Sequence, residues 1–164
     1  MTHQEWCIVQ LDRNGSVIFR KSSGAKNYVQ FTPSQLEKMK DRVLTHNHPS
    51  GSTFSSEDVI LMAAHELKGI RAAGKTKTYQ LSKKSNSQGN AFAADYKVAM
   101  SDNKKITDAK YRKMQKDFKK GRIDYQEYSE MLQKLNEELN QLNSEWLKEN
   151  AKSYGYRYSV IERR

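Results

Sequence analysis

The sequence predicts an α/β or α+β domain followed by a helical hairpin. Three observations support this fold class. Short segments rich in β-branched and aromatic residues recur up to residue 81, stretches with helical spacing of apolar residues lie between them, and the chain from about residue 92 onward is mostly helical. We therefore expect residues 1–91 to form the first domain, with a helical extension over residues 92–164.

The first segments predict a β-hairpin. Residues 5–11 (EWCIVQL) have strand composition, residues 12–15 (DRNG) are typical of a turn, and residues 16–20 (SVIFR) follow as the partner strand. A third short strand is expected at residues 27–31. The chain therefore begins with three strands that lie close together in the sequence.

A helix and a central strand follow. Thr32 and Pro33 predict a helix start that continues to about Lys40, and residues 42–45 (RVLT) predict a strand that leads directly into His46. A loop spans residues 49–54. The next helix is capped by Ser55 or Ser56, another strand is expected at residues 77–81, and residues 82–90 form a polar loop.

The last part of the chain predicts two antiparallel helices with a break at residues 119–122. After this break, apolar residues recur every three or four positions, at Tyr125, Tyr128, Leu132, Leu135, Leu139, Leu142 and Trp146. An earlier stripe of Tyr111, Met114 and Phe118 is expected to pack against it. Residues 155–161 alternate like a strand and are expected to return to the sheet.

Charge points to a polyanionic partner as one hypothesis. The net charge is +10 with a pI near 9.6, and residues 104–122 carry nine basic and two acidic side chains. The candidate nucleic-acid-binding residues are Lys113, Lys116, Lys119, Lys120 and Arg122. The alternative interpretation is a solvated helix face, and the tract has few of the interleaved aromatic residues that bind single strands.

Other classes of protein are disfavoured by composition. No stretch reaches the roughly 18–20 apolar residues of a membrane span, and the N-terminus lacks a basic segment followed by an apolar run. The single cysteine, Cys7, precludes an internal disulfide and favours a reducing compartment. We therefore expect a cytoplasmic protein with no membrane contact.

A candidate metal site follows the predicted central strand. His46 and His48 are two positions apart at the strand end, so both side chains can point toward one ion. Asp58, in the first turn of the next helix, can supply a third ligand. Two imidazoles and one carboxylate suit Zn²⁺ and leave a fourth position for a catalytic water, which needs a nearby carboxylate to accept its proton.

These residues resemble a known family motif. The segment HNHPSG, followed by Ser55-x-x-Asp58, is similar to the JAMM motif of JAB/MPN metalloproteases. Its residue sequence most resembles that of the RadC-like and phage-encoded branches of this family. The resemblance covers about residues 4–82. Its His-to-Asp loop is one residue shorter than usual, and the helix and strand that usually precede the glutamate strand are missing.

The resemblance implies both a fold and residue roles. The fold is a mixed β-sheet flanked by helices, with the layering of cytidine deaminases. His46, His48 and Asp58 correspond to the zinc ligands, Glu5 to the general base and acid, and Ser55 to the serine that stabilises the oxyanion.

The leading hypothesis is a zinc-dependent hydrolase that cleaves a peptide or isopeptide bond in a peptide or protein substrate. The first alternative is a nucleic-acid-associated protein of the RadC-like or phage type, which binds DNA or RNA or acts as a metal-dependent nuclease. The second is a phage morphogenesis module without catalysis. The implied compartment is the cytoplasm of a bacterium or of a phage-infected host, and the oligomeric state is left open.

Overall fold

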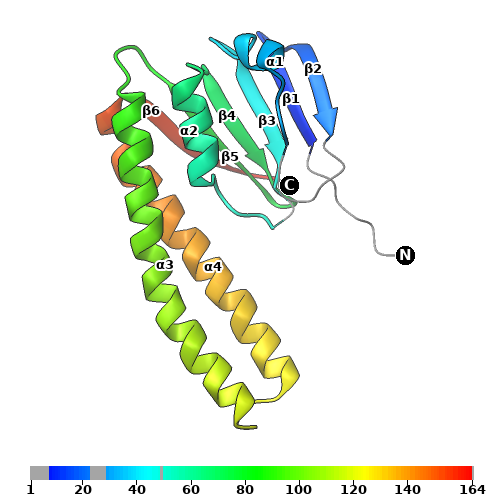
Figure 1. Cartoon of the computed structure of the whole chain (residues 1–164), viewed down its shortest axis with the longest axis vertical. Helices are drawn as coiled ribbons and strands as arrows, with labels where there is room; N and C mark the ends of the chain where they lie inside the picture. The colour runs from blue at the N-terminus through cyan, green and yellow to red at the C-terminus, as the bar shows by residue number, and fades with distance from the viewer. Residues whose placement is uncertain (1–7, 23–28, 49, 164) are drawn as a thin grey trace.

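A computed structural model describes residues 8–22, 29–48 and 50–163, and its centre is a six-stranded sheet (Figure 1). The strand order across the sheet is β2-β1-β3-β4-β5-β6. The strands are β1 (Ile8–Arg13), β2 (Ser16–Ser22), β3 (Val43–Asn47), β4 (Gly69–Ala73), β5 (Lys77–Lys83) and β6 (Tyr156–Glu162).

Short helices connect β2 to β3 and β3 to β4, and a long helical hairpin is inserted between β5 and β6. The helices are α1 (Pro33–Glu37), α2 (Ser56–Ala64), α3 (Gly89–Lys119), α4 (Tyr125–Asn150) and the 3-10 turn η1 (Ala151–Tyr154). Figure 1 shows α3 and α4 extending side by side away from the sheet. Both the helical hairpin and the returning final strand are therefore present.

The sheet is mixed. Strands β3 and β4 are parallel and are joined through α2, whereas every other neighbouring pair is antiparallel. A parallel pair needs such a crossover, and a helix is its usual form. The α+β class with a mixed sheet is thus confirmed.

One face of the sheet is apolar and covered by helices. Leu44 pairs with Leu11 on one side and with Ile70 on the other, and Ile70 pairs with Leu81, so these four buried side chains form a row across four strands. Helices α1 and α2 and the base of the hairpin lie over this face (Figure 1). The other face carries partly exposed polar residues that include Gln10, Thr45, Arg71 and Gln80.

The base of the hairpin belongs to the same core. Phe92 stacks on Tyr156 of β6 with a centroid distance of 4.7 Å and on Trp146 of α4 at 6.0 Å. Tyr96 and Leu147 are fully buried in the cluster that also contains the sheet residues. The expected boundary at residues 91–92 therefore falls inside α3, whose base shares one continuous core with the sheet.

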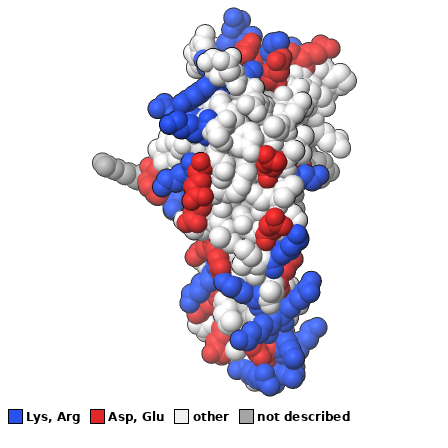
Figure 2. Space-filling model, turned by 90° about the vertical axis from the view of Figure 1, so that its left-hand side faces the viewer, with Lys and Arg blue, Asp and Glu red and all other residues white. Residues whose placement is uncertain are grey.

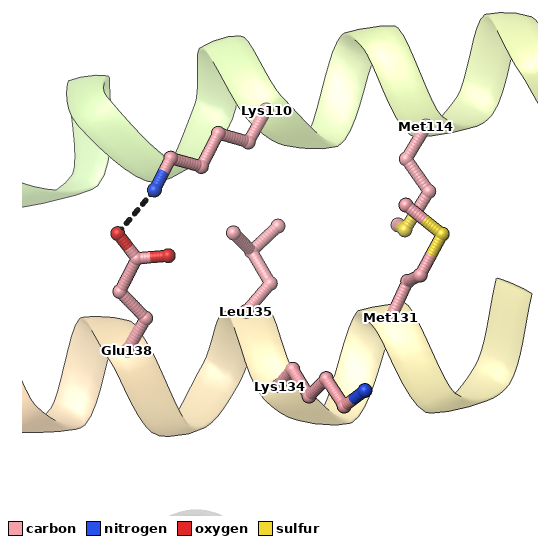
Figure 3. Close-up of a pocket in the computed structure, with 6 residues that line it drawn as sticks. All are labelled: Lys110, Met114, Met131, Lys134, Leu135 and Glu138. Atoms are coloured by element: carbon pink, nitrogen blue, oxygen red, sulfur yellow. Dashed lines mark hydrogen bonds and ion pairs between the residues drawn. The ribbon is translucent and has the colours of Figure 1, made fainter.

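Farther from the sheet, the hairpin is held by a narrower seam. Phe118 and Tyr128 stack at 4.7 Å near the tip, and Met114 is buried between the helices. A cavity of about 220 Å³ lies along this seam, with Leu135 and Met131 on one side and Met114 on the other (Figure 3). Tyr125, expected to begin the stripe, is 75% exposed and does not contribute to it.

Several predicted boundaries were wrong. Residues 29–31 of the expected third strand are irregular, and residues 27–28 lie outside the described part of the chain. Helix α1 ends at Glu37 rather than Lys40, and residues 38–41 form a turn in which Asp41 adopts a left-handed φ of 57°. Strand β4 was not predicted, and α3 begins at Gly89, inside the expected polar loop.

Within the described residues, no helix combines the length and the apolarity that a membrane crossing requires.

Candidate metal centre

Strand β3 places both histidines on the helix-covered face of the sheet. His46 is in register with Ala72 of β4 and is 6% exposed, so it lies on the same face as the buried Leu44. His48 follows the last strand residue and extends the pairing, because its backbone N–H donates to the carbonyl of Ala73 at 2.8 Å. The strand period of two therefore brings both rings to one side.

Helix α2 supplies the carboxylate. Ser55 is its N-cap, and its hydroxyl accepts a hydrogen bond from the backbone N–H of Asp58 at 3.2 Å. In return, the Asp58 carboxylate accepts from the backbone N–H of Ser55 at 2.8 Å, which completes a capping box. These bonds show that Ser55, and not Ser56, caps the helix, and they direct the Asp58 side chain back toward β3.

The three predicted ligands converge. The Nε2 atoms of His46 and His48 are 2.7 Å apart, and they lie 3.4 and 3.6 Å from Oδ1 and Oδ2 of Asp58, respectively. One ligand atom from each residue lies within 4.8 Å of the others, so this group could hold a metal ion.

These distances fit a small tetrahedral ion. Ligand atoms about 2.0–2.1 Å from a tetrahedral centre are separated from one another by roughly 3.3–3.4 Å. The distance from His46 Nε2 to Asp58 Oδ1, 3.4 Å, is already close to this value, whereas His48 Nε2 lies 3.6 Å from the other carboxylate oxygen, Oδ2. The shorter His46–His48 contact is that of a hydrogen bond between the rings, and ion binding requires the two nitrogens to separate by about 0.6 Å.

Hydrogen bonds already orient two of the ligands. Oδ2 of Asp58 accepts from both the hydroxyl and the backbone N–H of Ser55, at 2.9 and 2.8 Å, which leaves Oδ1 as the oxygen available to a metal. Nδ1 of His48 lies 2.8 Å from the carbonyl oxygen of Ser52. Because a carbonyl only accepts, Nδ1 carries the proton, and the lone pair of a neutral His48 ring is on Nε2.

Asp58 and His48 shift one another's pKa values. Burial alone would raise the pKa of Asp58, but hydrogen bonds with His46 and His48 hold that pKa far below its ordinary value of 3.8. Burial would lower the pKa of His48, but its hydrogen bond to Asp58 raises the pKa above 6.5 overall. The carboxylate is therefore ionised at neutral pH, as a metal ligand must be.

Of the two predicted catalytic residues, Glu5 and Ser55, the structure describes only Ser55. Glu5 lies outside the described residues, and so does Pro49 of the motif. Ser55 is beside the ligands, and its hydroxyl proton points to Asp58. In this geometry, Ser55 orients the candidate ligand Asp58.

Sequence reasoning missed a second set of residues that surround the loop between the ligands. Asn140 and Ser144 of α4, with Tyr79 of β5 and Tyr158 of β6, form hydrogen bonds with residues 51–53 or with one another. No local sequence pattern predicts these contacts, because Asn140 is 87 residues from its partner Thr53.

The five candidate nucleic-acid-binding residues lie together at the far end of the hairpin. Lys113, Lys116 and Lys119 are exposed on α3, whereas the intervening Met114 is buried against α4. Lys120 and Arg122 continue into the turn between the helices. Figure 2 shows a concentration of basic side chains at this end of the molecule.

Comparison of the chain with protein-family models, with curated proteins and with solved structures finds no match in any of the three.

Proposed function

We propose that the protein is a zinc-dependent hydrolase of the JAMM type that cleaves peptide or isopeptide bonds. The observation that carries the proposal is the convergence of His46, His48 and Asp58, which each offer one ligand atom within 4.8 Å of the others. The resemblance of HNHPSG and Ser55-x-x-Asp58 to the JAMM motif supports it, and so does the mixed sheet with α2 crossing between β3 and β4.

The donor set favours zinc among the common ions. Two neutral imidazoles and one carboxylate are typical of catalytic zinc sites, whereas Mg²⁺ and Ca²⁺ prefer oxygen ligands. Three protein ligands leave one coordination position for solvent, and His48 and Asp58 retain 16% and 21% exposure of their side chains. A small molecule can therefore reach the site.

A zinc ion held by His46, His48 and Asp58 would lower the pKa of a coordinated water and polarise the scissile carbonyl. Glu5 accepts a proton from the nucleophile and returns it to the leaving amine. This assignment is supported by the position of Glu5 in the chain, just ahead of β1, where Val9 is in register with His46. Ser55 turns its hydroxyl from Asp58 toward the developing oxyanion.

The test combines metal analysis with hydrolysis. Purified protein is expected to contain one zinc per chain, and both His48→Ala and Asp58→Ala to lose it. Glu5→Gln is the matched variant, because it is expected to keep the zinc and lose cleavage of peptide and isopeptide substrates by at least about 100-fold. Full activity in Glu5→Gln contradicts the assignment of the base, and absence of zinc from the wild-type protein contradicts the proposal as a whole.

The basic end of the hairpin favours nucleic-acid binding as a second candidate function. Lys113, Lys116 and Lys119 of α3 are exposed, whereas Met114 of the same helix is buried against α4, so basic side chains are concentrated on the exposed surface at this end (Figure 2). Such a surface suits a phosphate backbone. Binding to duplex DNA is expected to weaken steeply with salt, and Lys113→Glu with Lys120→Glu to abolish it. No retardation of DNA or RNA at about 150 mM salt contradicts this function.

The proposed compartment is a reducing cytoplasm, in a bacterium or a phage-infected host. The single cysteine supports it.

A further inference from the structure

We infer that Asn140 of helix α4 is a positioning residue that holds His48 in its metal-binding orientation. The inference rests on the proposed metal centre and assigns the helical hairpin a part in it. Asn140 comes from the half of the chain outside the metal-binding motif, yet its side chain contacts the loop between the ligands His48 and Asp58.

The connection passes through one rigid group, the peptide unit between Ser52 and Thr53. Its carbonyl oxygen accepts from Nδ1 of His48 at 2.8 Å, and its N–H donates to Oδ1 of Asn140 at 2.6 Å. Because a peptide unit is planar, the orientation of its N–H fixes the orientation of its carbonyl. Asn140 therefore sets the direction of the acceptor to which His48 is bonded.

The other end of the Asn140 amide is also held. Its Nδ2 donates to the Tyr79 hydroxyl at 3.0 Å, and that hydroxyl donates to the Gly51 carbonyl at 3.1 Å. Asn140 thus bonds directly to residue 53 and, through Tyr79, to residue 51. The two contacts enclose Ser52, the residue whose carbonyl meets His48.

A second bridge anchors the same loop to α4. The Thr53 hydroxyl lies 2.9 Å from the Tyr158 hydroxyl, which in turn lies 2.8 Å from Oγ of Ser144, one helical turn beyond Asn140. Tyr96 of α3 donates to the Phe54 carbonyl at 2.6 Å. Both helices of the hairpin consequently hold the loop.

The chemistry of the amide explains why an asparagine suits this position. It must accept from a backbone N–H and donate to a hydroxyl, and an amide does both without charge. The bond from Thr53 N–H to Asn140 also polarises the peptide, which makes its carbonyl a stronger acceptor for His48. A stronger bond at Nδ1 raises the basicity of Nε2, the atom that faces the metal.

The experiment compares zinc affinities, measured by competition with a chelator, in four variants. Asn140→Ala removes both contacts, and Asn140→Asp restores the acceptor for Thr53. Asn136→Ala and Asn136→Asp are matched controls, because Asn136 is exposed one turn earlier on α4 and the aspartate there supplies the same added charge. Circular dichroism and chelator-treated melting curves establish that each variant is folded.

The expected result is a loss of zinc affinity of about 3- to 10-fold in Asn140→Ala, below the 10- to 100-fold typical of direct partners of a ligand. Asn136→Ala is expected to match the wild type, and Asn140→Asp to lie within about twofold of Asn136→Asp. The ring ¹⁵N shifts of His48 should show a weakened Nδ1–H bond in Asn140→Ala alone.

The outcomes separate this inference from the proposed function. If the wild type binds one zinc and Asn140→Ala binds it as tightly as Asn136→Ala, the positioning role is wrong and the metal centre stands. If the wild type binds no zinc, both fail. Should Asn140→Ala not fold, Asn140→Leu removes both contacts while keeping a side chain of similar size, and an affinity equal to that of Asn136→Leu overturns the inference.

Discussion

The two adjacent serines at the start of α2 offer a sharp test of how the site is built. The Ser55 hydroxyl accepts from the backbone N–H of Asp58 and donates to its carboxylate. Ser56 makes no side-chain hydrogen bond to any residue that the structure describes. Ser55→Ala and Ser56→Ala therefore remove the same atom from neighbouring positions, with different predicted consequences.

The magnitude follows from the bonds that are lost. Removing an N-cap side chain costs about 1 kcal/mol, and a hydrogen bond to a charged group contributes about 1.5–3 kcal/mol. Because both bonds share one hydroxyl and the site is partly exposed, we expect Ser55→Ala to lower the free energy of unfolding by about 2 kcal/mol. For a chain of this length, that corresponds to a fall in Tm of about 4–8 °C. Ser56→Ala is expected to change stability by less than about 0.5 kcal/mol.

The assay is urea unfolding in the presence of a chelator, so that metal binding does not contribute. Zinc affinity is then measured separately. Ser55→Ala is expected to bind zinc about 10- to 100-fold more weakly, because Asp58 loses a partner that orients it. Equal stability and equal affinity in the two variants would refute the conclusion that Ser55 holds the carboxylate.

Three further predictions concern pH, backbone and core. In the metal-free protein, the raised pKa of His48 stabilises the fold fully below pH 6.5, and this stabilisation is lost as the pH rises through the pKa of His48 in the folded state. The lowered pKa of Asp58 has the opposite effect, because its stabilisation is present above pH 3.8 and is lost in acid. Zinc-loaded protein should instead gain stability toward alkaline pH, because its histidine ligands must be neutral, and parallel pH profiles in the two forms would contradict the assignment. Gly155→Ala should lower the Tm more than Gly121→Ala does. Both glycines have positive φ, but only at Gly155 would a Cβ lie 2.8 Å from Cα of Ser87. Equal decreases in Tm would show that this contact relaxes freely. Leu147→Ala, at a fully buried position of α4, should cost about 2–5 kcal/mol in urea unfolding, and a loss below about 1 kcal/mol would mean that the hairpin base does not share the core.

The convergence of the three candidate ligands was predictable because its geometry is local. A strand places residues two apart on one face, and a helix N-cap directs the residue at its third position back toward the cap. His46, His48 and Asp58 needed only these two rules and a short loop. The first β-hairpin and the turn at residues 119–122 could also be predicted, because each is set by a short local sequence.

Other features depend on contacts that are distant in sequence. Strand β4 (GIRAA) is short and contains two alanines, which are poor strand formers, and it becomes a strand because it lies between β3 and β5. The expected strand at residues 27–31 had suitable composition, but residues 29–31 pack against the core without a partner strand. Tertiary position outweighed local preference in both cases.

The loop anchors illustrate the same limit at the site. Asn140 lies on a helix whose apolar stripe is readable, but no pattern within α4 indicates that this residue contacts Thr53. Its environment exists only after the hairpin has returned to the sheet. The hairpin, expected as an extension, thus holds the loop between the candidate ligands His48 and Asp58.

The most direct test of the central claim is a crystal structure of the zinc-loaded protein with anomalous scattering measured at the zinc edge. We expect a single anomalous peak per chain, bonded to Nε2 of His46, Nε2 of His48 and Oδ1 of Asp58, with a solvent molecule as the fourth ligand. A peak elsewhere, or no peak in crystals soaked with zinc at neutral pH, would contradict the account.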